Sequence, residues 1–212
     1  MRNYFDHAAS SPLRPAAADA LAAAAQIVGN PAALHASGRR ARAVLEDARE
    51  ELAALLGARP DEVLFTCGGS ESDSIAVLGA AQAKADQQIV ISPLEHPAVG
   101  TVSSLLPDRV RQLPVAASGH VCIDDELPSA DVGLVSVQAV NNEIGTIQPI
   151  AEVVEYAHRI GAWMHCDGVQ ALGHLDFNFA ASGCDLASFS AHKIGGPVGV
   201  GVLLRRRGVE LA

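Results

Sequence analysis

The sequence predicts an α/β protein built on a doubly wound, mainly parallel sheet with helices on both faces. Short runs rich in Val, Leu and Ile alternate with helical stretches over most of the chain, a pattern typical of strands joined by crossover helices. Apolar residues make up 49% of the 212 residues, so the chain can bury the core of a packed domain. Ala is abundant and aromatic residues are scarce (4%), which favours helices packed closely on a sheet.

An N-terminal arm is expected over residues 1–14, followed by two helices. The first helix is expected over residues 15–28, because Pro15 suits a helix start and a Gly29-Asn30-Pro31 turn ends it. Ser37 is expected to cap the second helix, and Gly57 to end it. Apolar residues recur at helical spacing within the second helix, at Ala41, Val44, Leu45, Ala48, Leu52, Leu55 and Leu56.

The rest of the chain is expected to alternate between strands and helices. Strands are expected at residues 62–66, 88–92, 132–137, 163–166, 186–189 and 199–204. Helices are expected between them, near residues 70–84, 96–105 and 150–160. No internal repeat, low-complexity linker or change in composition interrupts this pattern. Residues 15–212 are therefore expected to form one large domain.

Composition argues against several classes of function. The chain has 24 acidic and 15 basic residues, a net charge of -9 that would repel a nucleic-acid backbone. No apolar stretch approaches the roughly 18 residues of a membrane span, and the N-terminus does not resemble a signal peptide. The cysteines, at positions 67, 122, 166 and 184, are widely spaced, as expected for reduced thiols of a cytoplasmic protein. They do not have the spacing of a metal site.

Polar residues follow the predicted strands directly, where ligands of open α/β sheets bind. The Gly-rich segment 66–72, with Gly69 and Ser70, suits a phosphate at a helix start, although plain helix capping is an equally common use. His96 suits stacking on a flat ring or proton relay, or else capping of the next helix. Asn141 and Asn142 suit orientation of a ligand oxygen, or else a turn.

Two ionisable residues near the end of the chain also follow predicted strands. Asp167 ends a buried strand, where a carboxylate is costly unless paired; a protonated pyridine nitrogen would keep it ionised, and a salt bridge or helix cap is the alternative. Lys193 follows another strand, after Ser190 and His192 and before a Gly-rich turn. Desolvation there would push its amine towards the neutral, nucleophilic form.

In combination these segments resemble the class V aminotransferase family, and specifically the cysteine desulfurases, which bind pyridoxal 5′-phosphate (PLP). The resemblance follows the chain in order, through seven segments: 4–12, 30–38, 65–71, 95–97, 140–145, 165–170 and 188–197. Each segment alone is common, whereas seven in register are highly specific. The resemblance implies the fold of the large domain of PLP-dependent transferases for residues 15–212.

The resemblance also implies a role for each site residue. Lys193 would carry the cofactor as a Schiff base, and Asp167 would pair with its pyridine nitrogen. His96 would stack on the ring and assist proton transfer, Gln170 would bind the phenolic oxygen, and Asn142 would hold that oxygen or the substrate carboxylate. The phosphate would be bound by Gly69, Ser70, Ser190 and His192.

The family reaction converts L-cysteine to L-alanine and passes the sulfur to an enzyme cysteine. Family members continue well past the position of Ala212, and their C-terminal small domain carries the nucleophilic cysteine and an arginine for the substrate carboxylate. We therefore expect this chain to be the PLP-binding portion, and none of its four cysteines occupies the place of the nucleophile.

The resemblance further implies a cytoplasmic homodimer and a sulfur-acceptor protein, with iron–sulfur cluster assembly among the pathways of sulfur metabolism served. Two alternatives stay open at this point. One is a non-catalytic domain of the PLP fold that acts as a binding module. The other is a selenocysteine lyase or another PLP enzyme of β-elimination.

Overall fold

A seven-stranded sheet lies at the centre of the computed structural model, which describes residues 3–124, 127–128 and 130–212. The strands follow the order β1-β7-β6-β5-β4-β2-β3 across the sheet. Their bounds are β1 Val63–Thr66, β2 Gln88–Ile91, β3 Val110–Gln112, β4 Val132–Gln138, β5 Trp163–Asp167, β6 Leu186–Ser190 and β7 Gly201–Arg205. Strands β2 to β6 pair in parallel, and β7 runs antiparallel to β6 and β1. The predicted mainly parallel sheet is confirmed.

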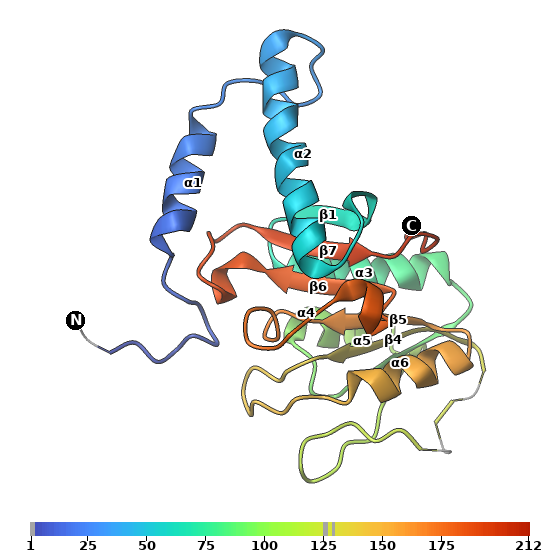
Figure 1. Ribbon diagram of the computed structural model, residues 1–212. Coiled ribbons are helices and arrows are strands. Elements are labelled where there is room, and N and C mark those ends of the chain that lie inside the picture. The colour runs from blue at the N-terminus through green and yellow to red at the C-terminus, as the bar shows by residue number, and fades with distance from the viewer. Residues whose placement is uncertain (1–2, 125–126, 129) are drawn as a thin grey trace.

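Two long helices cover opposite faces of this sheet, as predicted (Figure 1). Helix α3 (Gly69–Ala83) packs its buried residues against one set of strand side chains, which includes Leu134. Helix α6 (Ile150–Arg159) packs against the alternate set, which includes Val135. Successive strand residues point to opposite faces, so each central strand contributes to both cores.

The face under α3 changes from apolar to polar towards the carboxyl ends of the central strands. In β5, Trp163 packs with the apolar cluster, and His165 and Asp167 continue the same face. The same change occurs in β4 after Leu134 and in β6 after Leu186. The polar residues that replace the apolar ones are Ser136, Gln138, Ser188 and Ser190, all of them buried. A polar row therefore lies beneath the N-terminal half of α3.

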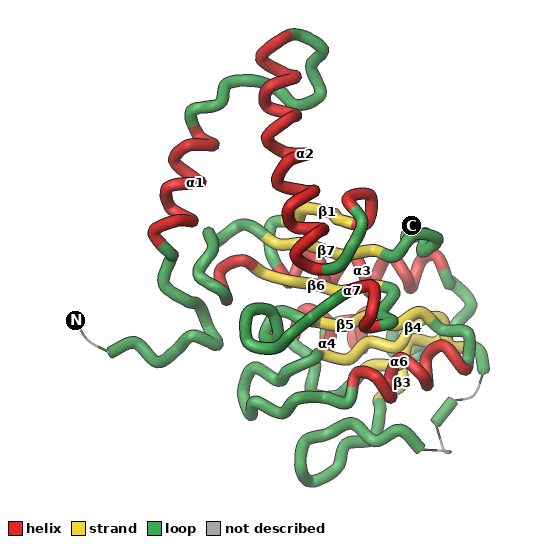
Figure 2. Tube along the Cα trace, viewed as in Figure 1, coloured by secondary structure: helices red, strands yellow, loops and turns green. Residues whose placement is uncertain are grey.

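Helix α1 (Pro15–Ala25) and the N-terminal part of α2 (Ala36–Leu56) project away from the sheet (Figures 1 and 2). The C-terminal end of α2 packs on the core through Ala53 and Leu56. Helix α1 has no buried residue, although it is rich in Ala. It ends three residues earlier than predicted, because the Gln26 N–H donates to the Ala23 carbonyl and the Ile27 N–H to the Ala24 carbonyl. The prediction that Ser37 caps α2 is wrong: the imidazole of His35 accepts the capping hydrogen bond from the Gly38 N–H.

Several short elements complete the fold. The predicted helix near residues 96–105 is two short helices, α4 (Pro97–Gly100) and α5 (Val102–Leu105). Strand β3 was not predicted, because it is a three-residue edge strand with exposed Arg and Gln side chains. Helix α7 (Phe179–Ser182) and the 3₁₀ turns η1 (Pro60–Glu62) and η2 (Ala191–Lys193) join the longer elements. Within the part of the chain that the structure describes, no helix has the length and apolarity needed to span a bilayer.

Candidate functional site

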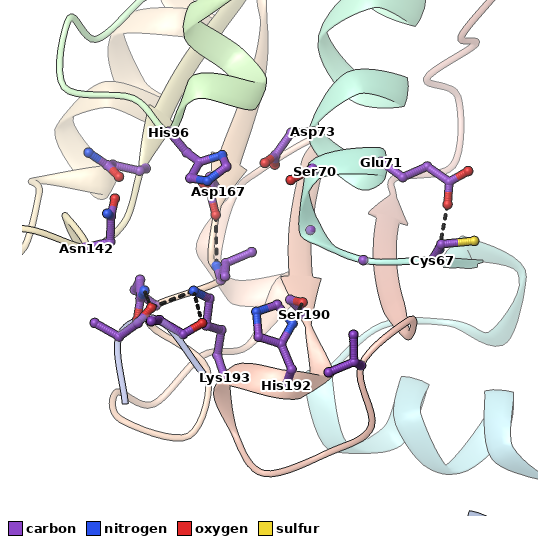
Figure 3. Close-up of a pocket in the computed structure, with 18 of the residues that line it drawn as sticks. Cys67, Ser70, Glu71, Asp73, His96, Asn142, Asp167, Ser190, His192 and Lys193 are labelled. Carbon is purple, nitrogen blue, oxygen red and sulfur yellow. Dashed lines mark hydrogen bonds between the residues drawn. The ribbon is translucent and has the colours of Figure 1, made fainter. Parts of the chain in front are cut away.

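A cavity of about 640 Å³ opens at the carboxyl ends of the central strands (Figure 3). Its volume falls within the usual range for small-molecule and cofactor sites. All nine site residues predicted from the sequence line this cavity: Gly69, Ser70, His96, Asn142, Asp167, Gln170, Ser190, His192 and Lys193. The structure thus brings together residues that are up to 124 positions apart in the sequence (193 − 69).

One end of the cavity is suited to an anion. Helix α3 starts there, and its N-cap, Gly68, makes no side-chain capping hydrogen bond. The backbone N–H groups of the first turn therefore face the cavity, where the helix dipole favours negative charge. A Cβ added to Gly69 would lie 2.7 Å from the Val169 side chain, so this close approach requires glycine. Across the cavity, Ser190 Oγ and His192 Nδ1 are hydrogen-bonded at 2.8 Å.

Lys193 reaches the cavity from the turn η2. Its Nζ donates to the carbonyl oxygens of Ala8 at 2.5 Å and Ala9 at 3.0 Å, so the N-terminal segment passes directly over the amine. Burial lowers the pKa of Lys193, and the negative charges of Asp167 and Asp6 oppose that shift. A lowered pKa favours the neutral amine that a nucleophile or base requires.

Asp167 ends β5 and is 6% exposed. Its Oδ1 accepts a hydrogen bond from the Val169 N–H at 2.9 Å. Burial raises the pKa of Asp167, and the Val169 N–H, His96 and Lys193 lower it. None of the ion pairs among the described residues includes Asp167. A cationic ligand group would therefore stabilise the carboxylate.

The remaining predicted residues surround these two. His96 both caps a helix and lines the cavity, because its Nδ1 accepts from the Ala98 N–H while the ring faces the cavity. Asn141 is used in the turn, where its Oδ1 accepts from two backbone N–H groups, whereas Asn142 lines the cavity. Gln170 donates from Nε2 to the Ala8 carbonyl at 2.8 Å. The capping alternative for His96 and the turn alternative for Asn141 are thus present in the fold, and the ligand-binding roles of His96 and Asn142 stay predictions.

The sequence interpretation missed several contributors to the cavity, and two of them bear on its chemistry. One is the backbone of Ala8 and Ala9, which binds Lys193 through carbonyl groups that no side-chain pattern reveals. The other is Asp73, which lines the cavity from α3. A signal for Asp73 was present: it lies four residues before Val77 and seven before Ala80, so it is an acidic residue on the buried face of a helix.

Cys67 is the one cysteine of the four that lines the cavity. It is exposed, and its backbone N–H donates to the Glu71 carboxylate. A side-chain hydrogen bond to Glu71, and the negative charge of that carboxylate, raise the pKa of the Cys67 thiol. A thiol held in its protonated form is a poor nucleophile.

The fold and this cavity identify the class of protein. The chain belongs to the Aminotransferase class-V family, whose model matches residues 3–211.

Within that family, the relatives are cysteine desulfurases. An IscS-like cysteine desulfurase of Mycobacterium tuberculosis is 48% identical over 97% of this chain and 56% of its own length. The chain thus spans about half the length of the curated relatives that it matches.

Solved structures share the fold closely. A NifS-like protein superposes with a TM-score of 0.92 at 34% identity, over 100% of this chain and 61% of its own. A structure described as SspA in complex with cysteine has a TM-score of 0.92 at 32% identity, over 99% of this chain and 63% of its own. The TM-scores confirm the predicted PLP-transferase-like fold over the whole chain.

Proposed function

We propose that this chain is the PLP-binding portion of a cysteine desulfurase, which takes sulfur from L-cysteine and leaves L-alanine. The observation that carries the proposal is the convergence of the nine predicted site residues on one cavity. The names of the relatives, and the complex of the similar protein SspA with cysteine, support L-cysteine as the substrate. The proposal concerns an activity that the relatives perform with longer chains.

The residues present fit PLP in three ways. Asp167 is a buried carboxylate that lacks an ion pair among the described residues, as expected for a partner of a protonated ring nitrogen. The uncapped start of α3, which a side chain at Gly69 would obstruct, fits a phosphate. The amine of Lys193 lies in the same cavity and is the group that would bind the aldehyde.

When bound, PLP supplies an electron sink for negative charge that develops at the substrate Cα. Asp167 would hold the ring nitrogen in its protonated form. Lys193 would accept the proton from Cα at Nζ, because burial favours its neutral form. His96 would present the face of its imidazole to the ring. Its Nε2 is then available to a substrate, since Nδ1 accepts the hydrogen bond that caps α4.

The activity is tested by incubating the purified chain with PLP, L-cysteine and a thiol reductant, which releases the transferred sulfur as sulfide, and measuring L-alanine and sulfide. We expect both products when a second polypeptide, corresponding to the rest of a relative's length, is added together with the chain. L-selenocysteine in a parallel reaction tests the lyase alternative. If cysteine yields no alanine either with the chain alone or with the second polypeptide added, the desulfurase proposal is contradicted.

A homodimer, a cytoplasmic location and a sulfur-acceptor protein are further proposals that come from the family resemblance. Light scattering of the purified chain tests the homodimer, with a mass of twice 21.9 kDa as the expected result. The IscS-type names of relatives favour iron–sulfur cluster assembly as the destination of the sulfur.

A further inference from the structure

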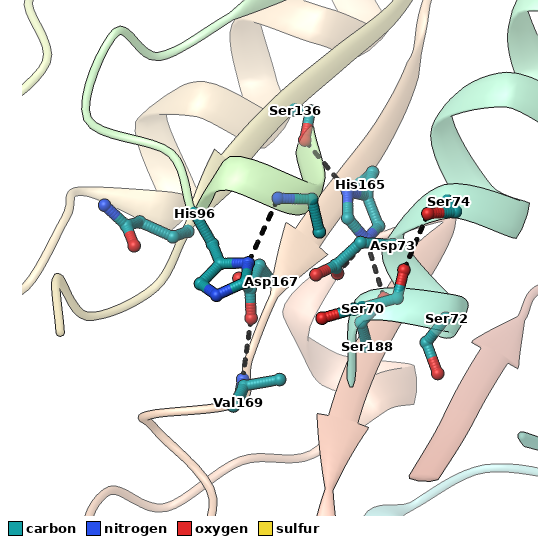
Figure 4. A network of polar contacts seen from close by, with 12 residues as sticks. Ser70, Ser72, Asp73, Ser74, His96, Ser136, His165, Asp167, Val169 and Ser188 are labelled. Carbon is teal, nitrogen blue, oxygen red and sulfur yellow. Dashed lines mark hydrogen bonds and ion pairs between the residues drawn. The ribbon is translucent and has the colours of Figure 1, made fainter. Parts of the chain in front are cut away.

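A second carboxylic acid lines the cavity from α3, and the roles proposed above do not use it. Asp73 projects from α3 and is 1% exposed. Its Oδ1 is buried and has no hydrogen-bond partner among the described residues. The same atom lies 3.6 Å from His165 Nε2, which is too far for a hydrogen bond (Figure 4). A buried, unpartnered carboxylate oxygen is costly, so it requires an explanation.

His165 does not supply a positive charge to Asp73. The imidazole is fully buried between two hydroxyl groups, with Nδ1 2.9 Å from Ser136 Oγ and Nε2 2.9 Å from Ser188 Oγ. One ring nitrogen of a neutral imidazole donates and the other accepts, which matches two hydroxyl partners. Burial lowers the pKa of His165 to about 3, so it is neutral at physiological pH.

The other titratable groups that face Asp73 are acidic. Asp167 lies two residues after His165 on the same face of β5, and Glu95 follows β2. The neighbouring strands β4 and β6 present the serine hydroxyls described above. The carboxyl groups of Asp73, Asp167 and Glu95 therefore share one buried region, and a single proton cannot neutralise all three. Like charges at short range cannot all be ionised.

The surroundings distinguish Asp167 from the other two acids. The hydrogen bond from the Val169 N–H lowers the pKa of Asp167, and so do the neighbouring His96 and Lys193. Glu95 has one backbone donor, the Gln138 N–H, and its Oε2 has no partner among the described residues. Burial, and the charge of Asp167, raise the pKa of Glu95 well above its usual value and that of Asp73 to about 8.

We propose that Asp73 is a positioning residue of this site: its buried carboxyl stays neutral beside His165, so that Asp167 is the acid that presents negative charge to the cavity. The effect on the cofactor rests on the proposed function, whereas the proton on Asp73 does not. Protonated Asp73 removes the repulsion that would otherwise push a proton onto Asp167.

A test without cofactor compares the free energy of unfolding of the wild type and D73N over a range of pH. The amide of D73N cannot titrate, so the difference between the curves isolates Asp73. A carboxyl whose pKa is raised by folding stabilises the fold most below its unfolded pKa, and this stability is lost as pH rises through the folded pKa. We expect the wild type to lose stability relative to D73N from about pH 3.8 to about pH 8, with a constant difference above pH 8.

D86N is the matched control, because Asp86 is an exposed acid in the turn after the same helix. Its curve is expected to run parallel to that of the wild type. Parallel curves for the wild type and D73N would overturn the proposal.

Carboxyl NMR of the wild type labelled at aspartate gives the same answer even if D73N fails to fold. An aspartate resonance should titrate near pH 8 in the wild type, and at lower pH in D167N. A spectrum in which every aspartate titrates near its ordinary value would also overturn the proposal.

The positioning role is tested with PLP present, by measuring the dissociation constant of the wild type and D73N over the same pH range. The ratio of the two constants is expected to be level while Asp73 is protonated and to change at higher pH, because only the wild type then gains a second negative charge. A ratio that is level throughout would contradict this role. Failure of the wild type to bind PLP would instead contradict the proposed function, and the unfolding curves would still decide whether Asp73 holds a proton.

Discussion

The two faces of the sheet use the same strands for different purposes. On the α6 side, the side chains of the central strands form a continuous apolar core, with Val137 and Met164 fully buried. On the α3 side, the alternate positions become polar as the strands approach their carboxyl ends, from His165 to Asp167 in β5. Successive residues of one strand therefore alternate between the packed core on one face and the site on the other.

This difference shows how the site is held. A polar row has no apolar packing of its own to stabilise it, and each of its members needs a partner. The opposite face supplies the packing, because every strand that carries a site residue is anchored there by apolar neighbours. We therefore expect substitutions on the two faces to have different effects. Those on the α3 side should change cofactor binding, and those on the α6 side should change the free energy of unfolding.

The largest expected effect is on the site face, at Lys193. Lys193→Ala should abolish the visible absorbance band of protein-bound PLP, because no other amine of the described residues lines the cavity. The chain has one further lysine, Lys84, whose ammonium lies over the Trp163 ring at 4.6 Å, away from the cavity. Lys84→Ala is the matched control and should retain the band. A band that persists in Lys193→Ala would rule out the lysine assignment.

The next effect is expected on the apolar face, at Met164. Met164→Ala should lower the free energy of unfolding by about 2–5 kcal/mol, because it leaves a cavity in a fully buried position. Chemical denaturation measures this loss. PLP affinity of the folded variant should stay close to that of the wild type. A loss of affinity as large as that of a site variant would break the separation between the faces.

Asp167→Ala tests the site face in the same strand. We expect PLP affinity to fall roughly 10- to 100-fold, since a hydrogen bond to a charged group contributes about 1.5–3 kcal/mol. Fluorescence or absorbance titration with PLP measures the change. The free energy of unfolding without cofactor should not fall, because the variant removes a buried acid whose pKa is raised by burial. Unchanged affinity would exclude the assigned pairing.

The smallest effect is expected at Tyr156, on the apolar side of the sheet. Its hydroxyl donates to the Pro128 carbonyl at 2.9 Å, and the ring is buried. Tyr156→Phe keeps the ring and removes this bond, so the free energy of unfolding should fall by about 0.5–1.5 kcal/mol. Thermal unfolding detects the shift. A loss comparable to that of Met164→Ala would indicate that the hydroxyl has a larger role than one hydrogen bond.

Much of this organisation could be predicted from the sequence. The alternation of strands and helices predicted the sheet. The polar residues after each apolar run predicted the site, because parallel strands bring their carboxyl ends to one edge of the sheet. The edge strand β3 could not be predicted, since three partly exposed residues carry no clear periodicity. The cap of α2 was assigned to Ser37, because hydroxyls are common caps, whereas His35 makes the bond.

The contacts of the site were harder to predict than its members. The carbonyls of Ala8 and Ala9 bind Lys193. Every residue has a backbone carbonyl, so the residue types do not indicate which carbonyls will bind. Asp73 was missed because an acid within a helix is usually solvated, and the sequence does not show that α3 lies over His165. The approach of a helix residue to a strand residue depends on tertiary packing, which a linear pattern does not contain.

The central claim is that Lys193 is the residue that carries the cofactor. The most direct test is to incubate the chain with PLP, trap the complex with borohydride and map the modified peptide by mass spectrometry. The account predicts a phosphopyridoxyl group on the peptide that contains Lys193 and none on the peptide that contains Lys84. Modification of Lys84 in place of Lys193, or of neither lysine, would contradict it.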